Sequence, residues 1–478
     1  MNLADLLFVS ADRYPDQVAV SDARTGQALT YEALARETEH VAAFLRAQGV
    51  EREQRIAIIC PNGVPYLPAA FGLLAAGACL VPIATNLPPA EVADILRDVD
   101  VNGCLASPDV EGRRGGGAVL TGGSCDAFRF EWTDRAAQAP SGFHALGPAF
   151  IRFTSGTTAR SKGVVLSHDA TRARVEAADR RLALTSEDRI LWVLPLAYHF
   201  AVTIVAYVKA GAHVVMCGDT LPHPVVEAIR QFDASVFYAS PFHFERLGNL
   251  AGGGPLKSLR LALSTSAPIT APVMRRFEER YEVPVAQAYG IIEAGLPCIN
   301  LGTEGLAPTS VGCPVPGYDV AIFSDDGVRL AEGATGEVGV RGAGLFSGYY
   351  APWQRLEEVT RDGWFLTGDL GRMDARGALH LEGRKKTVIF VAGVKFFPEE
   401  VEACINRFGG IVESRVSGVP HPRLGQVPRA EIVVAPEGCD LEALGAHCAR
   451  ALASYKVPID FTVVPAIPRT PGGKILRR

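Results

Sequence analysis

Residues 152–168 read RFTSGTTARSKGVVLSH, and this stretch indicates more about the chain than any other. Hydroxyl side chains flank Gly156, and Lys162 and Gly163 follow within seven residues. Such a loop offers backbone N–H groups, hydroxyl donors and one cation to a polyphosphate. Glycine suits it because a side chain would hold the backbone away from the anion. With the apolar, β-branched run that follows, the stretch predicts a phosphate-binding loop.

The loop is not the P-loop G-x-x-x-x-G-K-[ST]. Counting from Gly156, the second glycine position is Ser161, and Gly163 stands where Ser or Thr should follow Lys162. Taken alone, the segment is equally compatible with a surface turn rich in serine, threonine and glycine. Segments further along the chain decide between the two.

The composition excludes several function classes. The chain has 478 residues, of which 48% are hydrophobic and 21% charged, so we expect two to four globular domains. The net charge is −5 and basic residues are scattered, so nothing favours a nucleic acid or an anionic membrane as partner.

The cysteines and the N-terminus indicate a cytoplasmic protein. The ten cysteines lack zinc spacing, which predicts reduced and mostly buried thiols. The first residues lack the basic and apolar regions of a signal peptide. The nearest candidate for a membrane span is 65–84, but Pro68, Gly72, Gly77 and Pro82 interrupt it. We therefore expect a buried helix there, followed by a strand at 79–83.

Hydrophobic patterning predicts an α/β fold. Short apolar runs alternate with helical patterns, which favours largely parallel sheets. We expect strands at 55–59, 190–194, 213–216, 235–238, 259–263 and 283–286, and helices at 31–48, 223–231 and 272–281.

The rest of the chain differs in composition and in hydrophobic pattern. Between 311 and 346 glycine and proline become frequent, which predicts a β-barrel-like subdomain. After residue 387, helices at 399–408 and 441–452 and strands at 412–419 and 430–434 predict a small α+β domain. We expect a large N-terminal domain, 1–385, with two α/β sheet subdomains and the barrel-like one, and a small mobile C-terminal domain, 386–478.

Two segments after the loop carry groups that suit a nucleotide, although each also has an ordinary structural explanation. The segment YGIIE at 289–293 places Glu293 after a glycine turn, where its carboxylate could hold Mg²⁺ on a phosphate or merely end a strand. The segment STSAP at 264–268 is small enough for an aromatic base to lie against it, or is only a turn.

Three further segments lie nearer the C-terminus. In TGD at 367–369, Asp369 can accept hydrogen bonds from ribose hydroxyls or cap a turn. The segment GRKK at 383–386 is a hinge or a solvated basic turn. In PRTPGGK at 468–474, Lys474 follows two glycines and can be delivered into a site, or belongs to a basic tail.

Together, in order and spacing, these segments resemble the adenylate-forming superfamily of acyl- and aryl-CoA synthetases, peptide-synthetase adenylation domains and firefly luciferase. The resemblance runs from about residue 5 to the last residue. It implies two half-reactions. A carboxylate attacks the α-phosphate of ATP to give acyl-AMP and pyrophosphate, and a thiol then displaces AMP to give a thioester.

The resemblance also implies a role for each matching residue. The residues that grip the β- and γ-phosphates are Thr154, Ser155, Gly156, Thr157, Thr158 and Lys162. The adenine site comprises Ser266, Ala267, Pro268, Tyr289 and Gly290, with Tyr289 stacking on the base. Asp369 and Arg384 bind ribose. The catalytic set is Lys474, Glu293, Lys162 and Thr154, with Glu293 as the Mg²⁺ ligand. Lys386 is the hinge, and Gly393 and Lys395 face the site when the thioester forms.

Physical chemistry explains this division of roles. Nucleotidyl transfer needs positioning and charge neutralisation more than covalent help. Lys474 would bridge the substrate carboxylate and the reacting phosphate, so its removal should cost about 10²- to 10³-fold in adenylation rate. The thiol needs the space that Lys474 occupied, so we expect the C-terminal domain to rotate between the half-reactions.

The chain departs from the usual motifs in three places. TSGTTGxPKG has become TSGTTARSKG, Ile292 replaces a hydroxyl residue in YGxTE, and Thr387 replaces an acidic residue after the hinge. The key lysines, carboxylates and Arg384 are retained. We expect activity, slowed or with an altered ATP preference. The alternative is a degenerate homologue that binds nucleotide without turnover.

Residues 194–200, which the resemblance places at the acyl pocket, indicate the class of acid that is used. Residues 232–235, FDAS, look like the aspartate motif that holds an α-ammonium in amino-acid-activating relatives, but Asp233 comes too late after the loop and is expected at the surface. Residues 194–200 contain no carboxylate, so a buried amine would lack its counter-charge. We expect an aryl or aliphatic acid without a free α-amine. The expected pocket residues are Tyr198, His199, Phe237 and Tyr238, with Phe242 and His243 nearby.

The acceptor is expected in trans. Four residues follow Lys474, and we expect no fused carrier domain. The thiol would be CoA or the phosphopantetheine arm of a separate acyl or peptidyl carrier protein, and the sequence does not choose between them. A non-thiol acceptor of the acyl-AMP is a further alternative.

Overall fold

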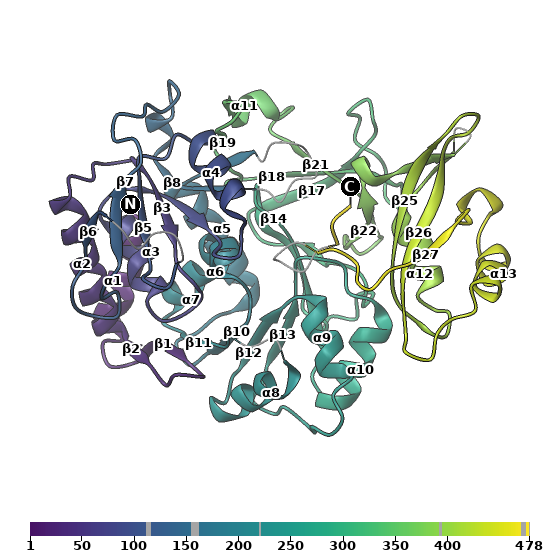
Figure 1. Cartoon of the computed structure of the whole chain (residues 1–478), viewed down its shortest axis with the longest axis horizontal. Helices are drawn as coiled ribbons and strands as arrows, with labels where there is room; N and C mark the ends of the chain where they lie inside the picture. The colour runs from purple at the N-terminus through teal and green to yellow at the C-terminus, as the bar shows by residue number, and fades with distance from the viewer. Residues whose placement is uncertain (111–115, 154–161, 219–220, 392–393, 470–474, 478) are drawn as a thin grey trace. The chain divides into compact units, whose positions relative to one another are not determined.

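The computed structural model describes the whole chain except residues 111–115, 154–161, 219–220, 392–393, 470–474 and 478 (Figure 1). The backbone groups into two compact units. The first comprises Met1–Asp319 and Val340–Phe365, and the second comprises Val320–Gly339 and Leu366–Arg478. The proposed domain boundary after residue 385 stays a prediction.

The first unit contains a nine-stranded sheet with a parallel centre. Its order is β16-β15-β14-β13-β12-β10-β11-β1-β2. The parallel strands are β14 (Val285–Ile291), β13 (Leu261–Ser264), β12 (Val236–Ala239), β10 (Arg189–Trp192), β11 (His213–Met216) and β1 (Val18–Asp22). Antiparallel strands complete the edges: β15 (Gly295–Asn300), β16 (Cys313–Pro314) and β2 (Ala28–Thr30). The predicted parallel sheet is confirmed.

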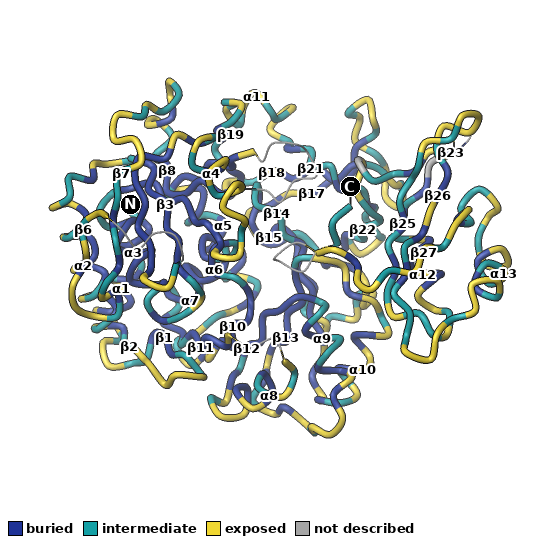
Figure 2. The backbone as a smooth tube through the Cα atoms, viewed as in Figure 1, coloured by how far each residue is buried: buried dark blue, intermediate teal, exposed yellow. Residues whose placement is uncertain are grey.

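A second nine-stranded sheet has the order β20-β19-β9-β8-β4-β3-β5-β7-β6. Its parallel centre consists of β8 (Pro148–Phe153), β4 (Cys79–Ile83), β3 (Arg55–Ile59) and β5 (Gly103–Ala106). The flanking strands are β20 (Gln354–Arg355), β19 (Gly348–Tyr349), β9 (Gly163–Ser167), β7 (Arg129–Trp132) and β6 (Ala118–Val119). Every residue of β3 and β4 is buried, which Figure 2 shows for β3 as a dark backbone. Such burial is typical of parallel strands that are covered on both faces.

Helices connect the parallel strands. The longer ones are α1 (Ala4–Arg13), α2 (Tyr31–Ala47), α3 (Tyr66–Ala75), α4 (Pro89–Asp98), α5 (His168–Leu182), α8 (Pro222–Gln231), α9 (Pro241–Gly248) and α10 (Ala271–Tyr281). The short ones are η1 (His144–Leu146), α6 (Leu196–His199), η2 (Phe200–Ile204), α7 (Val205–Ala210) and α11 (Leu356–Val359). The expected buried helix within 65–84 is α3. Of the helices in the described part of the chain, none has the length and apolarity that crossing a bilayer requires.

A four-stranded sheet includes the glycine-rich region. Its order is β17 (Tyr318–Phe323), β18 (Gly336–Gly342), β21 (Phe365–Met373) and β22 (Leu379–Arg384). Region 311–346 is therefore β-rich, as its composition predicts. All ten cysteines lie within the described residues, and eight are buried free thiols, which confirms that prediction.

The C-terminal part of the second unit is a small α+β fold. Its sheet has the order β24 (Val394–Phe396), β23 (Ile389–Val391), β26 (Gly425–Val434) and β25 (Ile411–His421), and β27 (Phe461–Val463) pairs with β26. Its helices are η3 (Lys385–Thr387), α12 (Pro398–Ile405), α13 (Leu441–Ala451) and η4 (Ser454–Lys456). Val401, Val416, Ile432 and Leu444 form its core at no more than 1% exposure, so this region has its own hydrophobic centre.

Candidate active site

The tip of the β14–β15 hairpin carries Glu293. Gly295 follows it with a φ of +78°, a conformation that favours glycine. A Cβ at Gly295 would stand 3.1 Å from the side chain of Arg174, so the turn also needs a residue without a side chain. The carbonyl of Glu293 accepts a hydrogen bond from the Phe346 N–H at 2.7 Å. These features hold the hairpin tip in one backbone conformation.

Arg174 anchors this turn from helix α5. Its side chain is buried, and Nη1 and Nη2 donate to the carbonyls of Ile292 at 2.9 Å and of Glu293 at 3.3 Å. Nε and Nη2 donate to the carbonyl of Gly344 at 3.0 and 2.6 Å. Burial lowers the pKa of Arg174, and the carbonyl dipoles offset that cost. The sequence analysis missed Arg174, because its partners lie far along the chain.

Tyr349 links two of the expected catalytic residues. Its hydroxyl donates to Glu293 Oε1 at 3.1 Å, and Lys162 Nζ lies 4.5 Å from the centroid of its ring. Burial, and then the neighbouring Glu293, raise the pKa of Tyr349, so the phenol stays protonated as a donor. Strand pairing places Tyr349 opposite Val164, directly after the phosphate-loop segment. The structure thus brings together Lys162 and Glu293 around a tyrosine that the sequence analysis missed.

The carboxyl ends of four parallel strands meet next to this point. Register pairs Trp192 of β10 with Tyr238 of β12, and Ser264 of β13 with Gln287 of β14. In open α/β sheets, ligands bind outside the carboxyl ends of the strands. The predicted adenine segments follow β13 and end β14, and are therefore at this edge.

The predicted adenine-turn residues differ in exposure. Ser266 is half-buried with a φ of +74°, and Ala267 and Pro268 are exposed. Tyr289 is 5% exposed, and Gly290 is half-buried. The phosphate-loop predictions at Thr154, Ser155, Gly156, Thr157 and Thr158 lie outside the described residues.

An aromatic cluster occupies the same edge of the sheet. The rings of Trp192 and Tyr238 stack with centroids 5.5 Å apart and planes 10° apart. His199 packs edge-on against both, at 5.6 Å from Trp192 and 6.0 Å from Tyr238. The neighbouring Tyr198 is half-buried, and burial raises its pKa to about 12. We call Trp192, His199 and Tyr238 the aromatic cluster.

Phe237 does not join this cluster. Successive strand residues point to opposite faces, and Phe237 packs against Phe244 at 5.5 Å on the other face of the sheet. His243 is buried and hydrogen-bonds Ser240 Oγ through Nδ1 at 2.9 Å, and Phe242 is half-buried beside it. Of the four expected pocket residues, His199 and Tyr238 belong to the aromatic cluster, and Phe237 lies on the other face of the sheet. That these residues form the acyl pocket stays a prediction.

Asp233 lies at the surface, as expected. Its side chain is 75% exposed, 3.8 Å from Arg189. It precedes the amino end of β12, whereas Tyr238 lies near the carboxyl end of that strand. Asp233 is therefore at the edge of the sheet opposite the aromatic cluster.

In the second unit, the two expected ribose ligands form an ion pair. Asp369 and Arg384 are directly opposite in the β21–β22 ladder, with Arg384 Nε 2.8 Å from Asp369 Oδ1. The Asp369 N–H donates to Thr367 Oγ1 at 3.1 Å, and Thr367 Oγ1 donates to the Val338 carbonyl at 2.9 Å. The Asp369 side chain is 8% exposed and that of Arg384 58%, so a buried carboxylate is paired with a largely exposed guanidinium.

The expected hinge lies in η3, where the structure describes only the backbone of Lys386. Its neighbour Lys385 is held by Glu337 at 2.8 Å and by Asp325 at 3.0 Å. Lys395 belongs to β24, and only the backbone of this residue is described. Gly393 and Lys474 lie outside the described residues.

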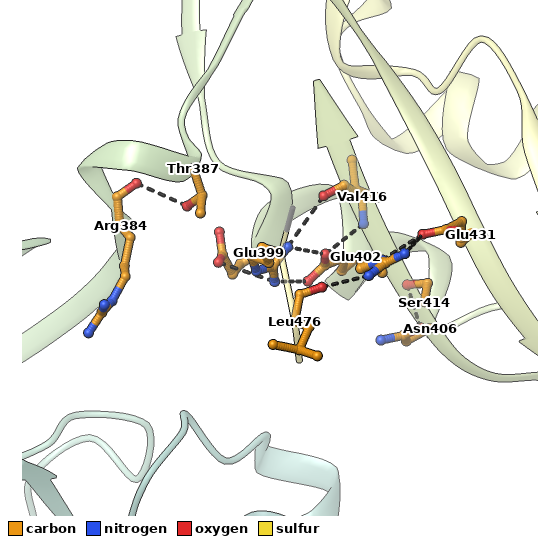
Figure 3. A network of polar contacts seen from close by, with 11 residues as sticks. Arg384, Thr387, Glu399, Glu402, Asn406, Ser414, Val416, Glu431 and Leu476 are labelled. Atoms are coloured by element: carbon orange, nitrogen blue, oxygen red, sulfur yellow. Dashed lines mark hydrogen bonds and ion pairs between the residues drawn. The ribbon is translucent and has the colours of Figure 1, made fainter. Parts of the chain in front are cut away.

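Residues directly after Lys474 are anchored firmly (Figure 3). Arg477 Nη1 and Nη2 donate to the two oxygens of Glu402 at 2.6 and 2.7 Å, and Nη2 lies 3.2 Å from Glu399 Oε1. Arg415 Nη1 donates to the Leu476 carbonyl at 2.6 Å. Charge-assisted pairs of this kind hold residues 475–477 on α12 and β25.

Comparison with known proteins agrees with this arrangement. The family described as AMP-binding enzyme matches residues 7–350, and the AMP-binding enzyme C-terminal domain matches residues 400–474. The chain is 31% identical to sulfoacetate–CoA ligase of Cupriavidus necator, over 99% of this chain and 96% of that protein. It is 30% identical to feruloyl-CoA synthase of an Amycolatopsis species, over 95% and 93%.

Solved structures give the same result. ATP-bound MatB from Rhodopseudomonas palustris matches with a TM-score of 0.84 at 25% identity, over 99% of this chain and 97% of that one. The chain therefore belongs to the AMP-binding enzyme family, and is an AMP-forming acid–thiol ligase that activates a carboxylic acid with ATP and transfers the acyl group to a thiol.

Proposed function

We propose that this ligase activates an aryl or aliphatic acid without a free α-amine, and that CoA is its thiol acceptor. The observation that carries the proposal is the set of Lys162, Tyr349 and Glu293 beside the aromatic cluster. A cation and a carboxylate suit a metal-bound polyphosphate, and apolar rings suit the acyl group.

Glu293 would hold Mg²⁺ on the nucleotide. Mg²⁺ keeps several of its waters and binds proteins through one or two carboxylates together with substrate phosphates. Glu293 fits this need, because the Tyr349 hydroxyl orients one oxygen of a carboxylate that stands at a hairpin tip. The metal would supply charge neutralisation on the phosphates.

The protein residues would then position the reactants. Lys162 would neutralise the β- and γ-phosphates, and Asp369 would accept hydrogen bonds from the ribose hydroxyls. Lys474 would bridge the attacking carboxylate and the α-phosphate, where negative charge builds up in the transition state. The proposed reaction forms a bond from the carboxylate oxygen to the α-phosphorus and breaks the bond to pyrophosphate.

The identity of the acid follows from the charges near the aromatic cluster. The described residues 194–200 contain no carboxylate, and Asp233 lies at the opposite edge of the sheet. A buried ammonium there would have no counter-ion. CoA is favoured as acceptor by the names of the relatives, while the phosphopantetheine arm of a carrier protein offers the same thiol.

The experiment is pyrophosphate release with ATP and Mg²⁺ over aryl, fatty, short and α-amino acids, each with and without CoA. We expect release with acids that lack an α-amine, and acyl-CoA and AMP when CoA is present. Lys474→Ala should lose about 10²- to 10³-fold in adenylation. It should still form thioester from supplied acyl-AMP.

The exposed Lys257 provides the matched control. Lys257→Ala should leave both half-reactions unchanged. Preference for an α-amino acid would contradict the proposed substrate class, and acyl-AMP that accumulates in the presence of CoA would contradict the proposed acceptor.

A further inference from the structure

Three arginines are buried among the described residues, and they differ in how their charge is satisfied. Arg55, Arg152 and Arg174 are 2%, 4% and 2% exposed. A guanidinium carries five N–H donors and cannot lose its charge inside a protein. Burying it is costly unless hydrogen-bond acceptors or an anion surround it.

Arg55 and Arg174 are satisfied by backbone carbonyls. Arg55 Nε donates to Val99 and Asp100 at 3.1 and 3.0 Å, and Nη2 donates to Ala137 at 2.9 Å. Arg174 uses all three nitrogens on the carbonyls around Glu293. Both arginines therefore have a structural role.

Among the described residues, Arg152 has no comparable set of carbonyl acceptors. Within the described residues, its guanidinium makes one hydrogen bond, from Nη2 to the carbonyl of Tyr198, and no carboxylate lies within ion-pair distance. The adjacent segment 154–161 contains no acidic residue in its sequence. Burial, and then the charge of Arg174, lower the pKa of Arg152 to about 10, although the charges of Tyr66 and Glu293 act to raise it. Among the described residues, this buried cation thus has no anion in contact with it.

The guanidinium belongs to the acyl end of the site. Phe150 and Arg152 share one face of β8, and Phe150 packs against Phe200 at 6.2 Å. Tyr198, which accepts the bond from Arg152, directly precedes His199 of the aromatic cluster. The charge of Arg152 also acts on Tyr238 and lowers its pKa, against the larger effect of burial. Arg152 therefore contacts the segment that carries His199 of the aromatic cluster.

Other donors in this region also lack acceptors. Trp192 Nε1, in the aromatic cluster, is buried without a hydrogen-bond partner among the described residues. The same holds for the hydroxyl of Tyr66, whose ring packs against Phe200 at 5.8 Å. These two donors are thus available to an oxygen-bearing ligand.

We propose that Arg152 binds a second anionic group on the acid substrate, so that the preferred substrates are dicarboxylic or sulfocarboxylic acids. This inference rests on the proposed function, and narrows it to acids with an anion besides the carboxylate that reacts. Arg152 is then a specificity-determining residue.

The reacting carboxylate is a poor alternative partner for Arg152. It loses its charge when its oxygen attacks the α-phosphate, so a buried cation on it would stabilise the ground state more than the transition state. A second anion keeps its charge throughout and binds equally in both states. A cationic amine at this position would instead be repelled by the guanidinium.

The first test compares matched acids with the wild-type enzyme, by pyrophosphate release at saturating ATP and Mg²⁺. The pairs are succinate with butanoate, glutarate with pentanoate, and sulfoacetate with propanoate. We expect the dianionic acid of at least one pair to have the higher kcat/KM. A higher kcat/KM for the monoanionic acid in every pair would overturn the inference while leaving the proposed function intact. No pyrophosphate release with any acid would overturn both this inference and the proposed function.

The second test changes the residue. Arg152→Met should lower kcat/KM for dianionic acids by about 10²- to 10³-fold and leave that for monoanionic acids within about threefold. Arg152→Lys should keep part of the preference for dianionic acids, and it replaces Arg152→Met in the test if the Met variant does not fold. The control Arg55→Met removes an equally buried guanidinium away from the aromatic cluster, and should lower stability without changing the ratio between paired acids. An equal loss for both acids, or a rise in the KM for ATP, would overturn the inference.

Discussion

Tyr349→Phe tests how the expected magnesium ligand is held. The substitution removes one hydroxyl that donates to Glu293 Oε1 at 3.1 Å, and keeps the ring over which Lys162 Nζ lies at 4.5 Å. Tyr349 is 7% exposed, so water does not readily replace the lost donor. The change therefore isolates the orientation of Glu293 from the position of Lys162.

The size of the effect follows from the chemistry of this bond. A hydrogen bond to a charged group contributes about 1.5–3 kcal/mol, and about 1.4 kcal/mol corresponds to tenfold in rate. If Glu293 acts in the transition state, Tyr349→Phe should slow adenylation about 10- to 150-fold. Tyr349→Leu removes the cation–π contact as well, which adds about 0.5–1 kcal/mol, or about another two- to fivefold.

The assay is single-turnover formation of acyl-AMP as a function of Mg²⁺ concentration. We expect Tyr349→Phe to lower the rate and to raise the Mg²⁺ concentration needed for half the maximal rate. The adjacent Tyr350 supplies a matched control, because its hydroxyl also donates to a carboxylate, Asp100 Oδ2, at 3.2 Å. Tyr350→Phe should leave the rate and the Mg²⁺ dependence unchanged. Equal losses in the two variants, or activity of Tyr349→Phe within about threefold of wild type, would refute the reasoning.

Further predictions concern the anchor of the turn, the ribose site and the dependence of stability on pH. Arg174→Met removes the guanidinium donor from three carbonyls, of which that of Glu293 keeps the Phe346 N–H, and should lower the free energy of unfolding by about 3–5 kcal/mol, measured by urea denaturation. Asp369→Asn should raise the KM for ATP about tenfold while the KM for the acid stays constant, because one charged acceptor is lost. Burial lowers the pKa of His213 and of His243 to about 4, from 6.5. The unfolded chain then binds protons that the folded chain does not, so stability should fall as the pH drops from about 6.5 to about 4, and His243→Asn should flatten the profile of urea midpoint against pH.

Each of these has an outcome that would contradict it. Unchanged unfolding of Arg174→Met would mean that water replaces the guanidinium. A higher KM for the acid in Asp369→Asn would place Asp369 near the acyl group instead of the ribose. A urea midpoint that stays constant between pH 7 and pH 4 would mean that the two histidines are accessible to protons in the folded protein.

The amino-acid sequence determined the elements and the order of the motifs. Strands such as 55–59 and 213–216 agree with the structure at both ends, because alternation of short apolar runs with helical patterns is a local property. Asp233 could likewise be assigned to the surface from its place before a strand. Strand parity also places Phe237 and Tyr238 on opposite faces, so a stricter use of it would have left Phe237 out of the pocket.

The tertiary structure alone decided which distant residues meet. Arg174 reaches Gly344 across 170 residues, and Tyr349 reaches Glu293 across 56, so no local pattern marks either contact. The same holds for Arg152, which the sequence analysis did not single out, although it directly precedes the predicted phosphate loop. What distinguishes Arg152 is that it is buried with few described acceptors, whereas the donors of the other two buried arginines, Arg55 and Arg174, are satisfied by carbonyls. The physical reason is that burial and hydrogen-bond satisfaction belong to the packed chain, whereas periodicity belongs to each segment by itself.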